Sequence, residues 1–172
     1  MSQNPDELFD VVDENDTPLF REKRAVVHRE CLLHRAVHIL VFNEQGQVYA
    51  QRRSLTKDTC PGRWTTSCSG HVDAGETYDT TAVRELQEEL GIHIDGIEKL
   101  RLLFKHPACR QTGNEFIQVY SLVWGGDITP DPAEVMEGHW LTPDALSRWM
   151  DETPDEFAPA FRLVWFEAQK FL

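Results

Sequence analysis

Three carboxylates near the middle of the chain are spaced so that together they can bind a metal ion. Glu85, Glu88 and Glu89 stand at positions i, i+3 and i+4, and a helix over residues 77–90 would place them on one face within one turn. Carboxylates held that close repel one another and are stabilised by a cation between them. Oxygen ligands suit Mg²⁺ or Mn²⁺, which also bridge to substrate phosphates. The spacing therefore predicts a metal site for phosphoryl chemistry, whereas the plainer interpretation is a solvated acidic helix face.

The residues around these carboxylates form a longer motif. Residues 70–92 read GHVDAGETYDTTAVRELQEELGI, in which a glycine turn precedes an amphipathic stretch. The fixed positions of the motif are Gly70, Glu76, Arg84-Glu85-Leu86, Glu88-Glu89 and Gly91-Ile92. They match the Nudix box at every specified position, so the chain resembles the Nudix hydrolase superfamily.

This resemblance implies a role for each polar residue of the box. Glu85 and Glu89 are expected to bind the metal directly, with Glu88 shared between metal and water and the Gly70 carbonyl as a further oxygen ligand. Arg84 and Glu76 are expected to pair with each other, or with the catalytic carboxylates, and so fix the geometry. The expected catalytic residues are therefore Glu88, Glu85, Arg84 and Glu76.

A second resemblance covers residues 34–76. The runs QRRSLTK (51–57), PGRW (61–64) and SGH (69–71) are similar to the type I isopentenyl diphosphate isomerase branch of the superfamily. That similarity places Arg53 and Lys57 where a substrate diphosphate is held, and two cations four residues apart at a strand end can neutralise one. Arg52 alternates to the opposite face and is expected to pair elsewhere.

The same branch also implies a second metal site, of which this chain carries only part. His34, His71 and Glu115 align with three of its ligands, although a lone histidine is more often structural than a ligand. His28 is displaced by one residue from a fourth ligand, and Gly113 stands where a fifth ligand, a glutamate, is expected. The sequence therefore predicts an incomplete site.

One position separates the two chemistries. The isomerases need a cysteine immediately before Gly-His, and this chain has Ser69 there. Cys68 is adjacent, but a shift of one residue along a strand points the side chain to the opposite face, so Cys68 is expected to be a small buried residue. A serine hydroxyl is a poor acid near neutral pH, so a complete metal helix beside Ser69 favours hydrolysis.

Bulk properties restrict the partners. The chain has 172 residues, a net charge of −12 and a pI near 4.9, which disfavours nucleic acid polymers and anionic membranes. Four cysteines form no CxxC pair, the N-terminus is polar, and no apolar run approaches the roughly 20 residues of a membrane helix. We expect a cytoplasmic protein with reduced thiols.

The hydrophobic pattern predicts an α/β fold, and the resemblance implies a Nudix-type α/β/α sandwich with a mixed central β-sheet. One domain is expected over residues 1–172, with residues 1–7 loose, the Nudix box at 70–92 and a C-terminal helix at about 157–172. Expected strands lie at 8–12, 18–21, 34–42, 48–53, 64–69, 100–104, 116–124 and 139–141, with a loop over 127–138 and helices at 77–90 and 143–150.

These patterns favour a Mg²⁺- or Mn²⁺-dependent Nudix hydrolase that cleaves a diphosphate linkage in a small organic or nucleoside diphosphate. The alternatives are an isopentenyl diphosphate isomerase-like enzyme and a catalytically silent Nudix-fold binding module. The catalytic base is a box glutamate, Glu134 or Glu137, and the sequence does not choose between them. A homodimer is compatible with the sequence, which leaves the oligomeric state open.

Overall fold

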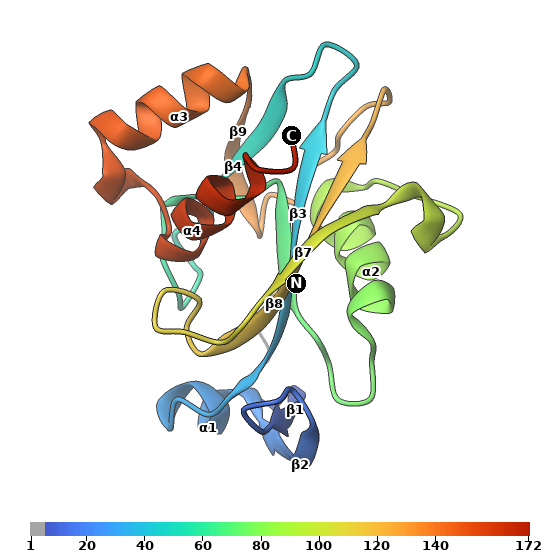
Figure 1. Ribbon diagram of the computed structural model, residues 1–172, viewed down its shortest axis with the longest axis vertical. Coiled ribbons are helices and arrows are strands. Elements are labelled where there is room, and N and C mark those ends of the chain that lie inside the picture. The colour runs from blue at the N-terminus through green and yellow to red at the C-terminus, as the bar shows by residue number, and fades with distance from the viewer. Residues whose placement is uncertain (1–5) are drawn as a thin grey trace.

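The computed structural model describes residues 6–172, and within them the chain builds a mixed seven-stranded sheet (Figure 1). The strand order is β5-β4-β3-β8-β7, with β6 beside β3 and β9 beside β4. At its centre, β3 (His34–Phe42) and β8 (Glu115–Val123) run parallel along their whole length. The other pairings in this sheet are antiparallel.

The remaining elements surround these two strands. The other strands are β1 (Leu8–Val12), β2 (Pro18–Lys23), β4 (Val48–Arg53), β5 (Trp64–Thr65), β6 (Cys68–His71), β7 (Arg101–His106) and β9 (Val135–Leu141). The helices are α1 (Arg24–Arg29), α2 (Tyr78–Leu90), α3 (Pro143–Glu152) and α4 (Pro159–Ala168), with short 3₁₀ turns at Ile97–Lys99 and Pro154–Glu156. No helix among residues 6–172 combines the length and apolarity needed to cross a lipid bilayer.

The sheet is covered on both faces, which is why β3 is apolar almost throughout. Val37, Ile39 and Val41 pack in one core with the inner face of α2. Alternate residues of the same strand, including Leu40, pack in a second core with α3 and α4. Figure 1 shows α2 on one side of the sheet and α3 with α4 on the other. The expected α/β sandwich with a mixed central sheet is confirmed.

Local signals set both ends of α2. The Thr77 side chain accepts a hydrogen bond from the Thr80 backbone N–H, and the Thr80 side-chain oxygen accepts one from the Thr77 backbone N–H, which forms a capping box. Gly91 ends the helix at φ 64°, a left-handed conformation that glycine adopts without strain. Leu86 and Leu90 are fully buried, so the helix is anchored by its apolar stripe.

The N-terminal segments form a separate small layer at one end of the sheet (Figure 1). Strands β1 and β2 pair antiparallel, as their sequence pattern predicts. Helix α1 follows and was not predicted, because its N-cap residue Lys23 makes no side-chain hydrogen bond and the helix has only six residues. The expectation for residues 1–7 concerns mainly residues 1–5, which lie outside the described part of the chain.

Two of the expected strands differ from the structure by more than one or two residues at an end. The predicted strand at 64–69 is two strands, β5 paired with β4 and β6 paired with β3. Between them, Thr66 and Ser67 use their hydroxyls to hydrogen-bond backbone carbonyls, which supports the crossing from one partner strand to the other. Strand β9 begins at Val135, whereas the acidic composition of 127–138 predicted a loop up to residue 138. Pairing with β4 makes the last residues of that segment extended despite their composition.

The C-terminal helix is also shorter than the predicted range of 157–172. Helix α4 runs from Pro159 to Ala168, because Pro159 occupies the first helical position and Phe157 pairs with Trp64 as an isolated bridge. The apolar stripe itself is present: Phe161, Val164 and Trp165 are buried in the core beneath the sheet.

The packing of α2 predicts the result of one substitution. Leu86→Ala removes a fully buried side chain and should lower the free energy of unfolding by about 2–5 kcal/mol. Leu102→Ala, at a half-exposed position of β7, is the matched control and should change it by less than about 0.5 kcal/mol. Urea denaturation of the two variants measures both values, and equal losses would contradict the position of α2 in the core.

Candidate active site

Two of the three box carboxylates are buried between α2 and the sheet. Glu85 and Glu89 are 9% and 5% exposed. Glu88 lies on the same face of the helix but is exposed to solvent. Glu89 Oε2 accepts hydrogen bonds from Gln51 Nε2 at 2.9 Å and from the Ser69 backbone N–H at 3.3 Å. Helix α2 is therefore tied to β4 and β6 by a charged group.

Glu85 lies directly against Gly70. A Cβ atom at position 70 would stand 2.0 Å from the Glu85 carboxyl group, so glycine is the residue that leaves room for this carboxylate. The contact brings the Gly70 backbone, the expected additional ligand, next to the helix carboxylates. The structure thus places the four predicted metal-binding positions together: Gly70, Glu85, Glu88 and Glu89.

Burial makes this carboxylate pair unfavourable without a cation. Burial, and then repulsion by Glu89, raises the pKa of Glu85 to about 8. Burial also raises the pKa of Glu89, although the hydrogen bond from Gln51 opposes the change. Two desolvated carboxylates gain most from a divalent cation, so the residues present fit the metal that the box implies.

Arg84 connects the rest of the box. Its Nη2 donates to Glu76 Oε2 at 3.0 Å, which is the expected Arg84–Glu76 pair, and to the His71 carbonyl at 3.2 Å. Its Nη1 donates to Glu85 Oε1 at 2.7 Å and to Glu88 Oε2 at 3.2 Å. A planar guanidinium with this many partners fixes the orientation of the carboxylates around it.

A cleft of about 600 Å³ opens beside these residues. Arg53 and Lys57, the predicted diphosphate-binding residues, both line it. Arg53 Nε donates to the Thr59 carbonyl at 3.0 Å, and Lys57 forms an ion pair with Glu134 in which both side chains are 10% exposed. Cations and box carboxylates therefore face one cavity, which suits a diphosphate bound through a metal.

The two candidate bases of the acidic segment are separated by the structure. Glu134 lines the cleft beside Lys57. Glu137 lies on β9, where it pairs with Arg52 and His139, and it is not among the cleft-lining residues described. The expectation that Arg52 pairs elsewhere is confirmed, because Arg52 pairs with Glu137 and is not among the cleft-lining residues described. Glu134 is the one of the two that can reach a bound substrate.

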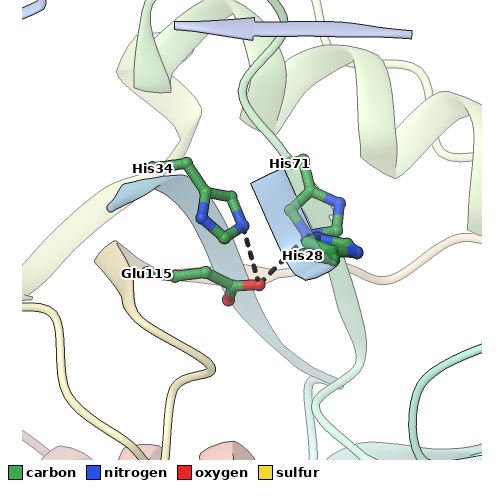
Figure 2. Close-up of side chains that lie close together, drawn as sticks. All are labelled: His28, His34, His71 and Glu115. Carbon is green, nitrogen blue, oxygen red and sulfur yellow. Dashed lines mark hydrogen bonds and ion pairs between the residues drawn. The ribbon is translucent and has the colours of Figure 1, made fainter. Parts of the chain in front are cut away.

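A second group of potential metal ligands, drawn in Figure 2, borders the cleft, which His71 and Glu115 line. His28, His34, His71 and Glu115 come from α1, β3, β6 and β8, and their ligand atoms lie within 4.8 Å of one another. Glu115 Oε1 is 3.0 Å from His71 Nε2 and 3.5 Å from His34 Nε2. The sequence prediction set His28 aside because of its one-residue offset, and that part was wrong.

The one-residue offset of His28 does not keep it out of the cluster, because His28 is not on a strand. A one-residue shift on a strand would move the side chain to the other face, but His28 lies in the last turn of α1. The chain then leaves the helix through Cys31, which has a φ of 53°. The helix sets where the imidazole points. Gly113 also has a positive φ, 73°, which disfavours a glutamate there. The described cluster is therefore three histidines and one carboxylate.

The ring of His34 is oriented by its backbone contact. His34 Nδ1 donates to the Leu32 carbonyl at 2.9 Å, and its buried Nε2, 3.5 Å from Glu115 Oε1, has no hydrogen-bond partner among the described residues. Burial, and then the neighbouring His71 and His34, lower the pKa of His28 to about 4. Three imidazoles and a carboxylate whose ligand atoms lie within 4.8 Å of one another fit a divalent transition metal.

Residues 68 and 69 point to opposite sides of β6, as predicted. Cys68 is fully buried in the core shared with α2, and burial raises the pKa of its thiol well above the usual range. Ser69 lines the cleft. The cleft therefore presents a hydroxyl at this position, and the thiol of the adjacent Cys68 is enclosed on the far side of the strand.

Comparisons with known proteins agree with this architecture. The sequence profile of the NUDIX domain matches residues 32–161. The chain belongs to the Nudix family. A curated relative named isopentenyl-diphosphate Delta-isomerase, from Paenarthrobacter aurescens (strain TC1), is 35% identical over 160 residues, 91% of this chain and 87% of the relative. The Escherichia coli (strain K12) protein named uncharacterized Nudix hydrolase YfcD is 35% identical over 87% of this Nudix chain and 82% of its own.

A solved structure gives the same result. The crystal structure of DR0079 from Deinococcus radiodurans superposes with a TM-score of 0.74 at 30% identity, covering 85% of this Nudix protein and 90% of that chain. The relatives thus carry both hydrolase and isomerase names, and the shared fold does not separate the two activities.

The close contact at Gly70 yields a test of metal binding. Gly70→Ala places a methyl group where the Glu85 carboxyl lies, so Glu85 must move, and we expect at least a roughly 10-fold loss of Mn²⁺ affinity in titration calorimetry. Gly125→Ala is the control, because its Cβ would meet only the exposed, rotatable Glu44 side chain. Unchanged Mn²⁺ affinity in Gly70→Ala would remove Glu85 from the site.

The raised pKa of Glu85 predicts a pH dependence of stability. Between 4.5, the ordinary value, and about 8, the folded metal-free protein binds more protons than the unfolded chain, so its stability should fall as pH rises through this window. Urea unfolding in EDTA from pH 5 to 8 measures the slope. Glu85→Gln should flatten it, and Mg²⁺ should restore stability to the wild type at pH 8. Identical slopes in wild type and variant would contradict the assignment.

Proposed function

We propose that this Nudix protein is a divalent-metal-dependent hydrolase that cleaves the diphosphate group of a small organic molecule. The observation that carries the proposal is the buried pair Glu85 and Glu89, held with Glu88 at one side of a cleft that also presents Arg53 and Lys57. Desolvated carboxylates select a cation, and nearby fixed cations select an anion, so the cleft is complementary to a metal diphosphate.

Each group has a defined task in this proposal. Glu85, Glu88, Glu89 and the Gly70 carbonyl would hold Mg²⁺ or Mn²⁺, which when bound polarises phosphate oxygens and makes water a better nucleophile at neutral pH. Arg53 and Lys57 neutralise the charge of the diphosphate. Arg84 and Glu76 hold the carboxylates in place. Glu134, beside Lys57, is positioned to take the proton from the attacking water.

The histidine cluster supports a second metal beside the same cleft, which His71 and Glu115 line. His28, His34, His71 and Glu115 would hold it (Figure 2). The feature that argues for a cation there over a purely structural cluster is the buried His34 Nε2, which faces Glu115 at 3.5 Å without a hydrogen bond among the described residues.

Isomerisation of isopentenyl diphosphate is the second candidate function. It is favoured by the histidine cluster together with the 35% identical relative that bears the isomerase name. It is disfavoured at residue 69, because allylic proton transfer needs an acid and the cleft offers a serine hydroxyl there while the Cys68 thiol is enclosed. Incubation with isopentenyl diphosphate separates the two: dimethylallyl diphosphate formed without phosphate release would replace our proposal.

The proposed roles of α2 predict the kinetics of its variants. With Mg²⁺ and a panel of small diphosphates, Glu88→Gln and Glu89→Gln should each lower kcat/KM at least about 100-fold, because each removes a charge from the site that holds the metal. Glu137→Gln is the control, since Glu137 pairs with Arg52 and His139 away from the cleft. Product release is measured by phosphate assay, with circular dichroism as the check on folding. Full activity in Glu89→Gln would exclude the mechanism.

A further inference from the structure

His38 is a buried histidine that the proposed chemistry does not use. It lies in the middle of β3, is 5% exposed, and lines the cleft. Its Nδ1 is 2.9 Å from the hydroxyl oxygen of Thr66. That hydroxyl in turn donates to the Cys68 carbonyl at 3.2 Å. The three residues form a short chain of hydrogen bonds that reaches the cleft at His38.

This chain of hydrogen bonds decides which nitrogen of His38 carries the proton. A carbonyl can only accept, so the single hydroxyl hydrogen of Thr66 is directed at Cys68, and the Thr66 oxygen must accept from His38 Nδ1–H. Burial lowers the pKa of the His38 ring to about 4, so the imidazole is neutral at physiological pH. A neutral imidazole with a proton on Nδ1 has a lone pair on Nε2.

The Nε2 lone pair is available to the cleft. Nε2 makes no hydrogen bond with the described residues, and it is not one of the polar atoms sealed inside the protein. Ser69 is the cross-strand partner of His38, so both side chains project from the same face, and Ser69 also lines the cleft. The Ser69 hydroxyl makes no side-chain hydrogen bond within residues 6–172. An acceptor and a hydroxyl therefore stand side by side, unengaged by the protein.

The chemistry of this pair excludes one part of the substrate and suits another. Phosphate oxygens are acceptors at neutral pH and would be repelled by the Nε2 lone pair, so the diphosphate belongs with Arg53 and Lys57. A hydroxyl or amino group can donate to Nε2, and a hydroxyl can also accept from Ser69. A hydrocarbon chain would leave both polar groups desolvated without partners.

We propose that His38, held by Thr66 and assisted by Ser69, is a specificity-determining residue that selects diphosphates whose organic group carries a hydroxyl or amino donor close to the diphosphate. The inference rests on the proposed hydrolase function and names its substrate class. It assigns hydrocarbon diphosphates, including the isoprenoid ones, to the disfavoured substrates of this cleft.

Four matched substrates test the selection. Butyl diphosphate and its 2-, 3- and 4-hydroxybutyl forms differ only in one hydroxyl group. With Mg²⁺, the wild type should favour at least one hydroxylated form by about 10-fold or more in both kcat/KM and calorimetric Kd. His38→Leu should abolish that preference and leave butyl diphosphate within about 3-fold of wild type, whereas His38→Gln, which retains an acceptor, should keep part of it.

The two measurements separate this inference from the hydrolase function. Absence of turnover with all four compounds counts against the hydrolase function. The proposed selection of hydroxylated diphosphates by His38 is then overturned as well. Turnover without any preference for a hydroxyl group overturns the selection and leaves hydrolysis intact. An equal loss on all four substrates in His38→Leu shows a structural role for His38 and also overturns the selection.

The tautomer can be tested in the wild type, without any variant that must fold. Nitrogen-15 NMR of the imidazole rings should show His38 protonated at Nδ1 and unprotonated at Nε2, with its signals assigned by their loss in His38→Gln. Thr66→Val keeps the side-chain volume but removes the oxygen that accepts from His38 Nδ1–H, so the proton is no longer held on Nδ1. The preference for hydroxylated substrates should then fall at least about 5-fold. A proton on Nε2 in the wild type would overturn the proposal.

Discussion

The contact between α2 and β6 is the constraint on which the rest of the cleft depends. Glu85 fits because residue 70 has no side chain, and Glu89 is held because the Ser69 N–H points at it. Both carboxylates are carried into a low-dielectric layer by the apolar stripe of α2, whose Leu86 and Leu90 are fully buried. Hydrophobic packing thus supplies the free energy that holds two like charges close together, and a cation is what makes the arrangement electrostatically favourable.

Local signals account for what could be predicted from the sequence. The spacing of Glu85 and Glu89, the cap at Thr77 and the stop at Gly91 are all decided within one helix, so periodicity and capping rules predict them. The central strands are equally readable, since β3 is buried on both faces and is therefore apolar along its length.

What could not be predicted depends on partners distant in sequence. His28 joins the histidine cluster through the turn after α1. In that turn Cys31 adopts a left-handed backbone conformation, which the sequence pattern does not indicate. Strand β9 is specified by pairing with β4 and not by its own composition. The sequence therefore could not indicate that Glu134 lines the cleft and that Glu137 does not. The hydrogen bond from Thr66 to Cys68 arises where the chain changes strand partner, which local propensity does not indicate.

Strand β6 explains how one scaffold can serve two chemistries. Its consecutive residues make different contacts. The Ser69 backbone N–H donates to Glu89, Gly70 leaves room for the Glu85 carboxyl group, and His71 belongs to the histidine cluster. The backbone roles at residues 69 and 70 constrain the strand but not the Ser69 side chain, which faces the cleft. That side chain can therefore change between hydroxyl and thiol without disturbing either group of metal-ligating residues. Relatives at 35% identity bear both isomerase and hydrolase names, so a shared fold does not by itself fix the reaction.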